Sequence, residues 1–573
     1  MLIQTRRASG QYEDRMTSLR QTAAALIALA VAGTPAQAAA PPPADTLTPI
    51  QHYVRARAAD AAGMTAAAAA GYGAALAAAP DDPLIATRAY RQAMMAGDRA
   101  LALRAADVLE ASDNLPPDGW MLLLTEAVQA KDWIAANSII DRIERDEVFA
   151  FTVPVLRAWV VRGTGKGDPL EPLGQARRIG GIAAAYAAEH RALLLIATGQ
   201  RDDGITAVRT LISPDGRGAL RLRMAGASAL VKSGDRQSAL GLLAGADPLL
   251  TVARERIEQR KSLPPPVSTA AEGIAELFTR VAVDINRERV TPIALTFARL
   301  GTFLAPKHAE TWLVTSELLT SEEYYGAALD VLANVRRKDP MAEAARGQRM
   351  ELLVKQGDRE TALEEALVAT RGREVEPADW TRVGGLYSDL DRPADAAAAY
   401  RNALTLSEAR PEDGSRWTLL LLLGSALHEA GDWAAARPVL EESVKLAPEE
   451  AVVLNYLGYA QLERRENLAE AQSLIERASK LRPEDSAITD SLGWTHYVRG
   501  DLPKAIELLE RAVIGEPGEP TINEHLGDAY WTAGRKLEAR FAWRAALVHA
   551  DAKDAQRIAT KIDMGWAPEV AAP

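Results

Sequence analysis

Histidine is the residue type to examine first, because imidazole ligates metals and transfers protons near neutral pH. His428 and Glu429 begin the H-E-x-x-H pattern of a zinc-binding helix, but Asp432 stands where the second histidine is required. We therefore predict no metal site, and we interpret His428 as a residue at a solvated helix end. The seven histidines of the chain are His52, His190, His308, His428, His496, His525 and His549.

A second candidate for chemistry is the segment GTGKG at residues 163–167, which has the glycines and the lysine of a phosphate-binding loop. It lacks the first glycine at the required distance, and Gly167 stands where serine or threonine must follow Lys166. We interpret the segment as a flexible turn. The chain also has no G-x-S-x-G motif and no cysteine, which excludes thiol catalysis, thiolate metal sites and disulfides. We expect neither catalytic activity nor a cofactor.

The net charge and the length of the chain exclude further classes of protein. The formal net charge is -11, and no cluster of lysine and arginine marks a surface for a phosphate backbone, so we expect no nucleic-acid partner. With 573 residues, the chain is too long for one compact core, so we expect several domains or a repeat array. Abundant alanine and leucine, with only 5% aromatic residues, favour helices over strands.

The first 38 residues have the pattern of a signal peptide. An apolar run at residues 22–33 (TAAALIALAVAG) follows Arg20, and Ala36 and Ala38 fit an A-x-A cleavage site. Glu13 and Asp14 are unusual before such a run, and a start at Met16 would remove them. We therefore expect an exported, periplasmic chain in which a proline-rich spacer at residues 39–45 follows the leader.

Two other interpretations of this leader are a twin-arginine signal at Arg6 and Arg7, which lies far from the apolar run, and a buried N-terminal helix. Because there is no cysteine, the mature chain is not expected to be a lipoprotein. No later segment is long and apolar enough to suggest a transmembrane helix.

Small residues recur at a fixed interval in the last third of the chain. The glycines are separated by 34, 35 and 34 residues, and a leucine precedes each one. Alanine follows each glycine after 12 or 13 residues, and proline closes all units but the last, where Asp551 takes its place. These residues are Gly424, Gly458, Gly493 and Gly527; Ala436, Ala471, Ala505 and Ala539; and Pro448, Pro483 and Pro517.

This pattern resembles the tetratricopeptide repeat, W-x2-L-G-x2-Y, then A-x3-F, then P, on a 34-residue period. The match is good over 376–550, where Gly384 begins another copy, and it is degenerate over 271–368 and weak over 46–260. We divide the chain accordingly, with a proline-rich break at 261–270 between two arrays and a helix end and tail at 551–573. Weaker copies include Trp312 and Ala328, Phe278 and Ala294, Trp120 and Ala136, and Ala68 and Tyr72.

The spacing has a physical reason, because two antiparallel helices approach closely only where glycine faces alanine. We expect Leu440, Ile475, Leu509 and Trp543 to fill the space between neighbouring units, and proline to stop each second helix. The fold class is therefore all-α, a tetratricopeptide-type α-solenoid, which the resemblance makes a right-handed superhelix. Turns between helices are expected at Gly97 and Asp98, Lys131 and Asp132, Gly199 and Gln200, Gly234 and Asp235, Gly357 and Asp358, Gly431 and Asp432, and Gly500 and Asp501.

In this family the first helix of each pair lines a groove that binds a partner. The resemblance assigns the groove to Asn455, Tyr459, Asp490, Trp494, Tyr497, Glu524, Asp528 and Trp531. Aromatic residues beside carboxylates suit a peptide or protein that has apolar side chains and some basic charge. Alternatively, these aromatic residues are partly buried between the helices.

The leader and the array resemble bacterial envelope proteins that act as adaptors for a periplasmic carboxyl-terminal processing protease. The resemblance implies an exported scaffold that brings such a protease, or a cell-wall enzyme, to its substrates. Two alternatives remain: an assembly factor for envelope, exopolysaccharide or secretion machinery, and an enzyme whose site lies in residues 46–260.

Overall fold

The computed structural model describes residues 47–212, 220–245, 248–264, 267–371, 375–408 and 416–572. Within these ranges the chain is helical and has no β-strand, which confirms the predicted all-α class. No helix among these residues has the length and apolar character needed to cross a membrane. The predicted signal peptide and proline-rich spacer lie outside the described residues.

The helices form two compact units, Ala38–Asp358 and Arg359–Pro573. In the first unit, the N-terminal unit, consecutive helices mostly pack as antiparallel pairs. Its helices are α2 (Pro49–Ala61), α3 (Thr65–Ala78), α4 (Pro83–Ala96), α5 (Arg99–Ala111), α6 (Pro117–Ala130), α7 (Trp133–Asp146), α8 (Val153–Thr164), α9 (Leu173–Ile179), α10 (Gly181–Ala197), α11 (Arg201–Leu211), α12 (Leu220–Lys232), α13 (Arg236–Leu242), α14 (Pro248–Glu258), α15 (Ala270–Arg287), α16 (Thr291–Leu304), α17 (Ala309–Ser321), α18 (Tyr325–Leu332) and α19 (Ala342–Lys355).

The proline-rich segment at 261–270 does not separate two arrays, which corrects the sequence-based expectation. After this segment, α15 packs against α8, and α16 packs against α6 and α4. Both helices therefore contact the helices that precede the proline-rich segment. The boundary between the two compact units lies later, at Asp358. The physical reason is close packing, because Gly273 on α15 lets the helix lie directly on the buried ring of Trp159.

Replacing Gly273 with alanine should destabilise the N-terminal unit by about 2–3 kcal/mol, the usual cost of overpacking a core. A Cβ atom there would lie 2.1 Å from Cδ2 of Trp159, and that ring is fixed because its Nε1 donates to Nδ1 of His190 at 2.9 Å. Urea unfolding measures the change. Gly347→Ala on α19 is the control, since nothing lies within 4 Å of its Cβ position. Equal stabilities of the two variants would contradict this packing.

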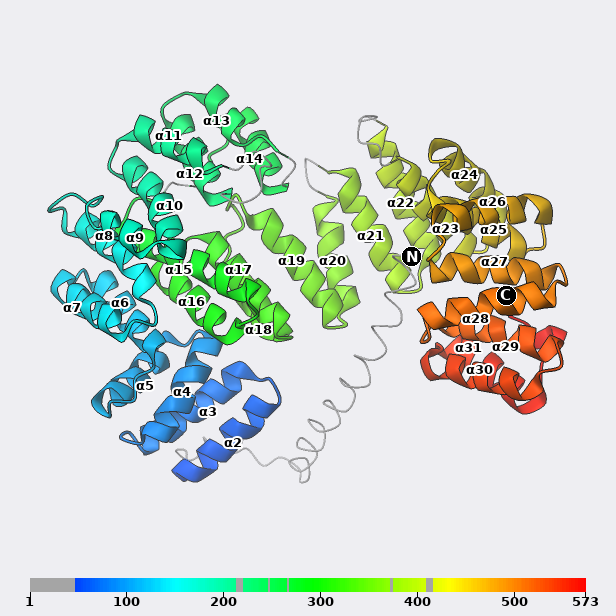
Figure 1. Cartoon of the computed structure of the whole chain (residues 1–573), viewed down its shortest axis with the longest axis horizontal. Helices are drawn as coiled ribbons and strands as arrows, with labels where there is room; N and C mark the ends of the chain where they lie inside the picture. The colour runs from blue at the N-terminus through cyan, green and yellow to red at the C-terminus, as the bar shows by residue number, and fades with distance from the viewer. Residues whose placement is uncertain are drawn as a thin grey trace, which may run out of the picture. The chain divides into compact units, whose positions relative to one another are not determined.

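In the other unit, the C-terminal unit, α20 to α31 follow one another as a stack in which each helix packs against the next (Figure 1). The first helices of the later pairs also touch each other, α25 with α27 and α27 with α29. The helices are α20 (Arg359–Ala369), α21 (Pro377–Asp389), α22 (Pro393–Ser407), α23 (Arg416–Glu429), α24 (Trp433–Leu446), α25 (Ala451–Glu463), α26 (Leu468–Leu481), α27 (Ser486–Val498), α28 (Leu502–Gly515), α29 (Pro520–Thr532), α30 (Lys536–His549) and α31 (Ala552–Met564).

The repeated glycines let the two helices of each pair approach closely. A Cβ atom would lie 2.5 Å from Tyr400 at Gly384, and 2.3 Å from Trp543 at Gly527. The large residues thus pack on the glycine of their own pair, and do not only fill the space between neighbouring units as the sequence predicted. Leu440 packs on Gly424, Ile475 on Gly458, and Leu509 on Gly493.

The predicted turns are confirmed in the C-terminal unit. Gly431 has φ +81°, a conformation that suits glycine, and Asp432 then caps α24 by accepting a hydrogen bond from the backbone N–H of Ala435. The longer turn between Gly458 and Ala471 contains Arg465 and Asn467, both with positive φ. The segment expected as a helix end and tail at 551–573 begins instead with a separate helix, α31, because the Asp551 side chain accepts a hydrogen bond from the N–H of Asp554.

Candidate protein-binding face

The predicted groove residues lie on three neighbouring first helices, and we call their surface the first-helix face. Asn455 and Tyr459 are on α25, Asp490, Trp494 and Tyr497 are on α27, and Glu524, Asp528 and Trp531 are on α29. Contacts between these helices bring the residues together. Asp490, Trp494, Glu524 and Asp528 are buried, and the other four are partly buried. Their role in binding a partner stays a prediction.

An aromatic stack forms the middle of the first-helix face. The ring of Trp494 stacks between His525, at a centroid distance of 4.0 Å, and Tyr497, at 4.4 Å. Tyr459 also contacts this stack, because its hydroxyl oxygen lies 3.5 Å from Nε2 of His525. The sequence analysis did not include His525 among the groove residues. A signal was present, because His525 directly follows Glu524 and lies 35 residues after Asp490, which matches the repeat spacing.

His525 is held by a carboxylate from the preceding pair. Its Nδ1 lies 2.9 Å from Oδ2 of Asp490, and the imidazole is fully buried. Burial opposes the charged imidazolium, but the negative charges of Asp490, Glu524 and Asp528 outweigh it and raise the pKa of His525 above its ordinary value. The first-helix face therefore favours a protonated histidine at its centre.

Two cations from α31 meet the carboxylates of α29. Nζ of Lys561 lies 2.7 Å from Oε1 of Glu524 and 2.8 Å from both oxygens of Asp528, and the Lys561 side chain is fully buried. Arg557 donates to both oxygens of Glu524, at 2.9 and 2.6 Å. With His525 protonated, three cations therefore face Asp490, Glu524 and Asp528, and Arg557 also pairs with Asp554 at 2.7 Å.

Sequence reasoning missed Lys561 and Arg557 because α31 lacks the repeat signature. A signal was present, since Asp551 and Asp554 form a helix cap, and Ile558 and Ile562 repeat every four residues. Ile558 is fully buried beside Trp543, so α31 packs on α30 in the position of a further first helix.

Besides His525, a second group with a shifted pKa lies on this part of the C-terminal unit. It is Glu463, the last residue of α25. Its carboxylate lies 3.7 Å from Nε2 of His428 on α23. Burial raises the pKa of Glu463 from 4.5 to about 7, while His525 and Arg464 oppose this shift. Burial also lowers the pKa of His428, helped by Arg464, so burial favours the neutral form of both groups.

The stability of the C-terminal unit should fall as pH rises from 5 to 8, partly through Glu463. A carboxyl whose pKa is higher in the folded chain binds a proton more tightly there, so stability is lost between the unfolded value of 4.5 and about 7. Glu463→Gln should remove this part of the slope and raise stability at pH 8 by about 1–2 kcal/mol, after discounting for partial exposure. Urea unfolding at pH 5 and pH 8 tests this; an unchanged slope would contradict it.

Polar side chains also converge in the N-terminal unit. Arg221 on α12 pairs with Glu276 on α15 and, at 2.9 Å, with Glu310 on α17. Burial raises the pKa of Glu276 to about 7, although Arg221 lowers it. The guanidinium of Arg221 links the two carboxylates and so holds three helices together, and we assign the cluster a structural role. Among the residues that the structure describes, no group of His, Cys, Asp and Glu could hold a metal ion.

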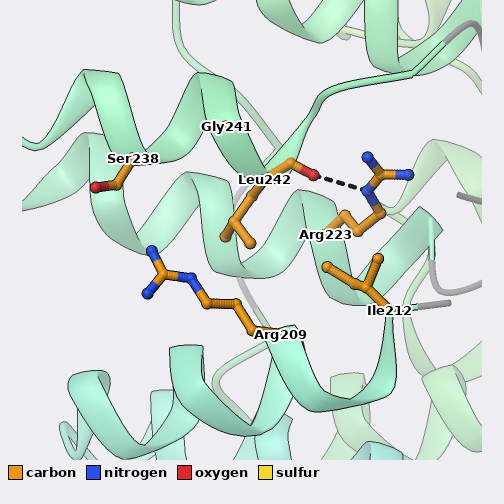
Figure 2. Close-up of a pocket in the computed structure, with 6 residues that line it drawn as sticks. All are labelled: Arg209, Ile212, Arg223, Ser238, Gly241 and Leu242. Atoms are coloured by element: carbon orange, nitrogen blue, oxygen red, sulfur yellow. Dashed lines mark hydrogen bonds between the residues drawn. The ribbon is translucent and has the colours of Figure 1, made fainter. Parts of the chain in front are cut away.

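Two arginines, Arg209 and Arg223, line a pocket near α11 and α13 (Figure 2). We assign Arg223 a structural role, because its guanidinium is hydrogen-bonded to backbone carbonyl groups. Nε of Arg223 donates to the carbonyl oxygen of Leu242 at 2.7 Å, and its Nη2 donates to that of Ala244. The guanidinium thus satisfies carbonyl groups at the end of α13, where a cation also suits the helix dipole.

Comparison with known proteins agrees with the repeat pattern. A family profile described as tetratricopeptide repeat matches residues 384–451, 457–520 and 491–555. No curated protein matches the chain. The solved structures that it resembles include a tetratricopeptide repeat protein from Parabacteroides merdae, which is 15% identical, with 45% of this chain and 98% of that chain covered and a TM-score of 0.38.

Two further structures are similar over different lengths. The Cut9–Hcn1 hetero-tetramer of APC/C is 14% identical, with 91% of each chain covered and a TM-score of 0.34. TTC0263 from Thermus thermophilus is 22% identical, with 32% of this chain and 97% of that chain covered and a TM-score of 0.28. The profile match and the glycine contacts described above agree in identifying residues 384–451 and 457–555 as segments similar to the tetratricopeptide repeat.

Proposed function

We propose that this chain is an exported scaffold that binds proteins through the first-helix face of its C-terminal unit. The observation that carries the proposal is the gathering of Tyr459, Trp494, Tyr497 and Trp531 on neighbouring first helices of a tetratricopeptide array. Large aromatic side chains are common anchors in protein interfaces, and such arrays are generally scaffolds without catalysis of their own. The leader pattern at residues 22–38 supports export to the periplasm.

The specific role that we propose is to bring a periplasmic protease, or a cell-wall enzyme, to its substrates. The resemblance of the sequence to envelope adaptors of a processing protease supports this role. The assembly of envelope or secretion machinery is the alternative role for the same binding face. The two roles differ in the class of protein that the chain should bind, so identification of the partner separates them.

Affinity purification from envelope extracts tests the proposal. The variant should replace Tyr497 and Trp531, which are partly exposed, and should keep Trp494, which is buried against His525 and supports the fold. The double alanine variant should recover at least about tenfold less partner, as the loss of two aromatic anchors implies. Phe541→Ala is the control, since Phe541 is 58% exposed on the second helix α30.

Recovery of a protease together with its substrates would support the adaptor role, and recovery of assembly proteins would support the alternative. Equal recovery by the wild-type chain and the double variant would refute binding through the first-helix face.

A further inference from the structure

After α31 the chain turns back onto the first-helix face, and we call residues 565–572 the return segment. Gly565 has φ +90° and lies against Trp531, where an added Cβ atom would be 2.2 Å from Cζ2 of the ring. Trp566 then packs beside Trp543 and Ile558. Further on, Ala572 joins the apolar cluster that contains Leu462, Ala471, Ile475 and Trp494. The return segment therefore passes from α29 to the residues of α25, α26 and α27.

One carboxylate holds the return segment near both of its ends. Nε1 of Trp566 donates to Oδ2 of Asp528 at 3.1 Å, and the backbone N–H of Ala572 donates to the same oxygen at 3.0 Å. Between these two points, Pro568 and Glu569 are exposed. Ala572 is 8% exposed, so its methyl group is the small apolar contact at the far end.

The return segment is attached much more weakly than α31. The helix is fixed by Lys561, which is fully buried between two carboxylates, and by the paired hydrogen bonds of Arg557 to Glu524. Residues 566 to 572 are held by two hydrogen bonds, by the packing of the partly buried Trp566 ring and by one small apolar side chain, with no ion pair among these described residues. The segment can therefore leave the first-helix face while α31 stays in place, which keeps Lys561 and Trp543 bound to Asp528.

Departure of the return segment would uncover a defined set of groups. Oδ2 of Asp528 would again accept hydrogen bonds, and the part of the Leu462, Ile475 and Trp494 cluster that Ala572 covers would become accessible beside it. Nζ of Lys561 already lies 2.8 Å from Oδ2 of Asp528 and would repel a second cation there, so the matching donor is a neutral N–H group.

We propose that the return segment is a built-in peptide ligand and that an extended segment of a partner protein replaces it. This proposal rests on the proposed function. The partner segment presents the same chemistry: neutral N–H donors for Asp528, of which an aromatic indole is one, and a small apolar side chain for the site beside Trp494. The return segment thereby sets the affinity of the first-helix face, because a partner binds only in competition with it.

A labelled peptide with the sequence of residues 565–572, GWAPEVAA, tests the proposal with the full-length chain. Fluorescence anisotropy should show that Trp566→Ala binds the peptide at least about tenfold more tightly than the wild-type chain, because the competing segment is loosened. Ala572→Glu should have the same effect, since it places a carboxylate near Asp528 while leaving the ring packing of Trp566 intact. Glu569→Ala, at an exposed position, should behave as the wild type.

Circular dichroism must show that both variants retain their helices, and two different variants guard against a folding defect in one. A peptide whose tryptophan is replaced by alanine should lose at least about tenfold in affinity for both variants. Equal binding of the peptide to all four chains, or no binding to any folded variant, would overturn the proposal. Neither result would affect the proposed function, because the purification with the Tyr497 and Trp531 variant tests partner binding separately.

Discussion

Replacement of Lys561 by methionine should destabilise the last helices of the C-terminal unit by about 3–5 kcal/mol, as expected when one partner of a buried ion pair is removed. The ammonium is fully buried and lies within 2.8 Å of Glu524 and Asp528. Methionine keeps the length of the apolar stem but leaves Asp528 as a buried anion without a cation. Arg557 would still pair with Glu524, so the loss should centre on Asp528.

Hydrogen exchange of peptides from α29, α30 and α31 measures this change locally, which avoids treating the whole chain as one cooperative unit. Lys480→Met on α26 is the matched control, because that lysine is exposed and its replacement should change stability by less than about 0.5 kcal/mol. Adding Asp528→Asn to Lys561→Met should recover part of the loss. A loss below about 1 kcal/mol for Lys561→Met would show that the lysine is not buried between these carboxylates.

Gly527→Ala should have the second large effect, a loss of about 3 kcal/mol, at the upper end of the usual cost of overpacking. The new methyl group would lie 2.3 Å from Cδ1 and Nε1 of Trp543. That indole cannot easily move, since it is fully buried and its Nε1 donates to Oδ1 of Asp528 at 2.9 Å. At Gly493 the nearest atom to the new methyl group, Cγ of Leu509, would be 2.9 Å away, so Gly493→Ala should cost less. Thermal unfolding of the variants ranks them.

Two adjacent glycines on α21 provide the control for this prediction. A Cβ atom at Gly384 would lie 2.5 Å from Cε1 of Tyr400, whereas at Gly385 its nearest neighbour, the Tyr400 hydroxyl, is 4.0 Å away. Gly384→Ala should therefore destabilise the chain, and Gly385→Ala should be neutral or stabilise it by up to about 1 kcal/mol, as alanine does inside helices. If both substitutions had the same effect, the repeat frame would be misplaced.

Much of the C-terminal fold could be predicted because its determinants are local and periodic. Gly424, Gly458, Gly493 and Gly527 identify the close contact within each pair, since only glycine fits under a large residue there. The turn at Gly431 and Asp432 follows from backbone conformation and capping alone. The helices that bear the predicted groove residues follow from the same frame, so their common location on α25, α27 and α29 needed no tertiary information.

The state of those residues could not be predicted, because it depends on a segment outside the repeat. The burial of Glu524 and Asp528 comes from Lys561 and Trp566, which no repeat pattern connects to them. On an isolated helix, Lys561 and Arg557 look like solvated charges. In the N-terminal unit, the packing of α15 on α8 is likewise a tertiary effect, and the close contact of Gly273 with Trp159 belongs to it.

The central claim is that partner proteins bind the first-helix face of the C-terminal unit, and site-specific photo-cross-linking in cells tests it most directly. A photoreactive phenylalanine derivative should replace Tyr497 on α27, which is partly exposed on that face, and in a second chain Ile514 on α28, which is 81% exposed. We predict cross-linked partner proteins from position 497 and none of them from position 514. Cross-links from position 514 with none from position 497 would contradict the claim.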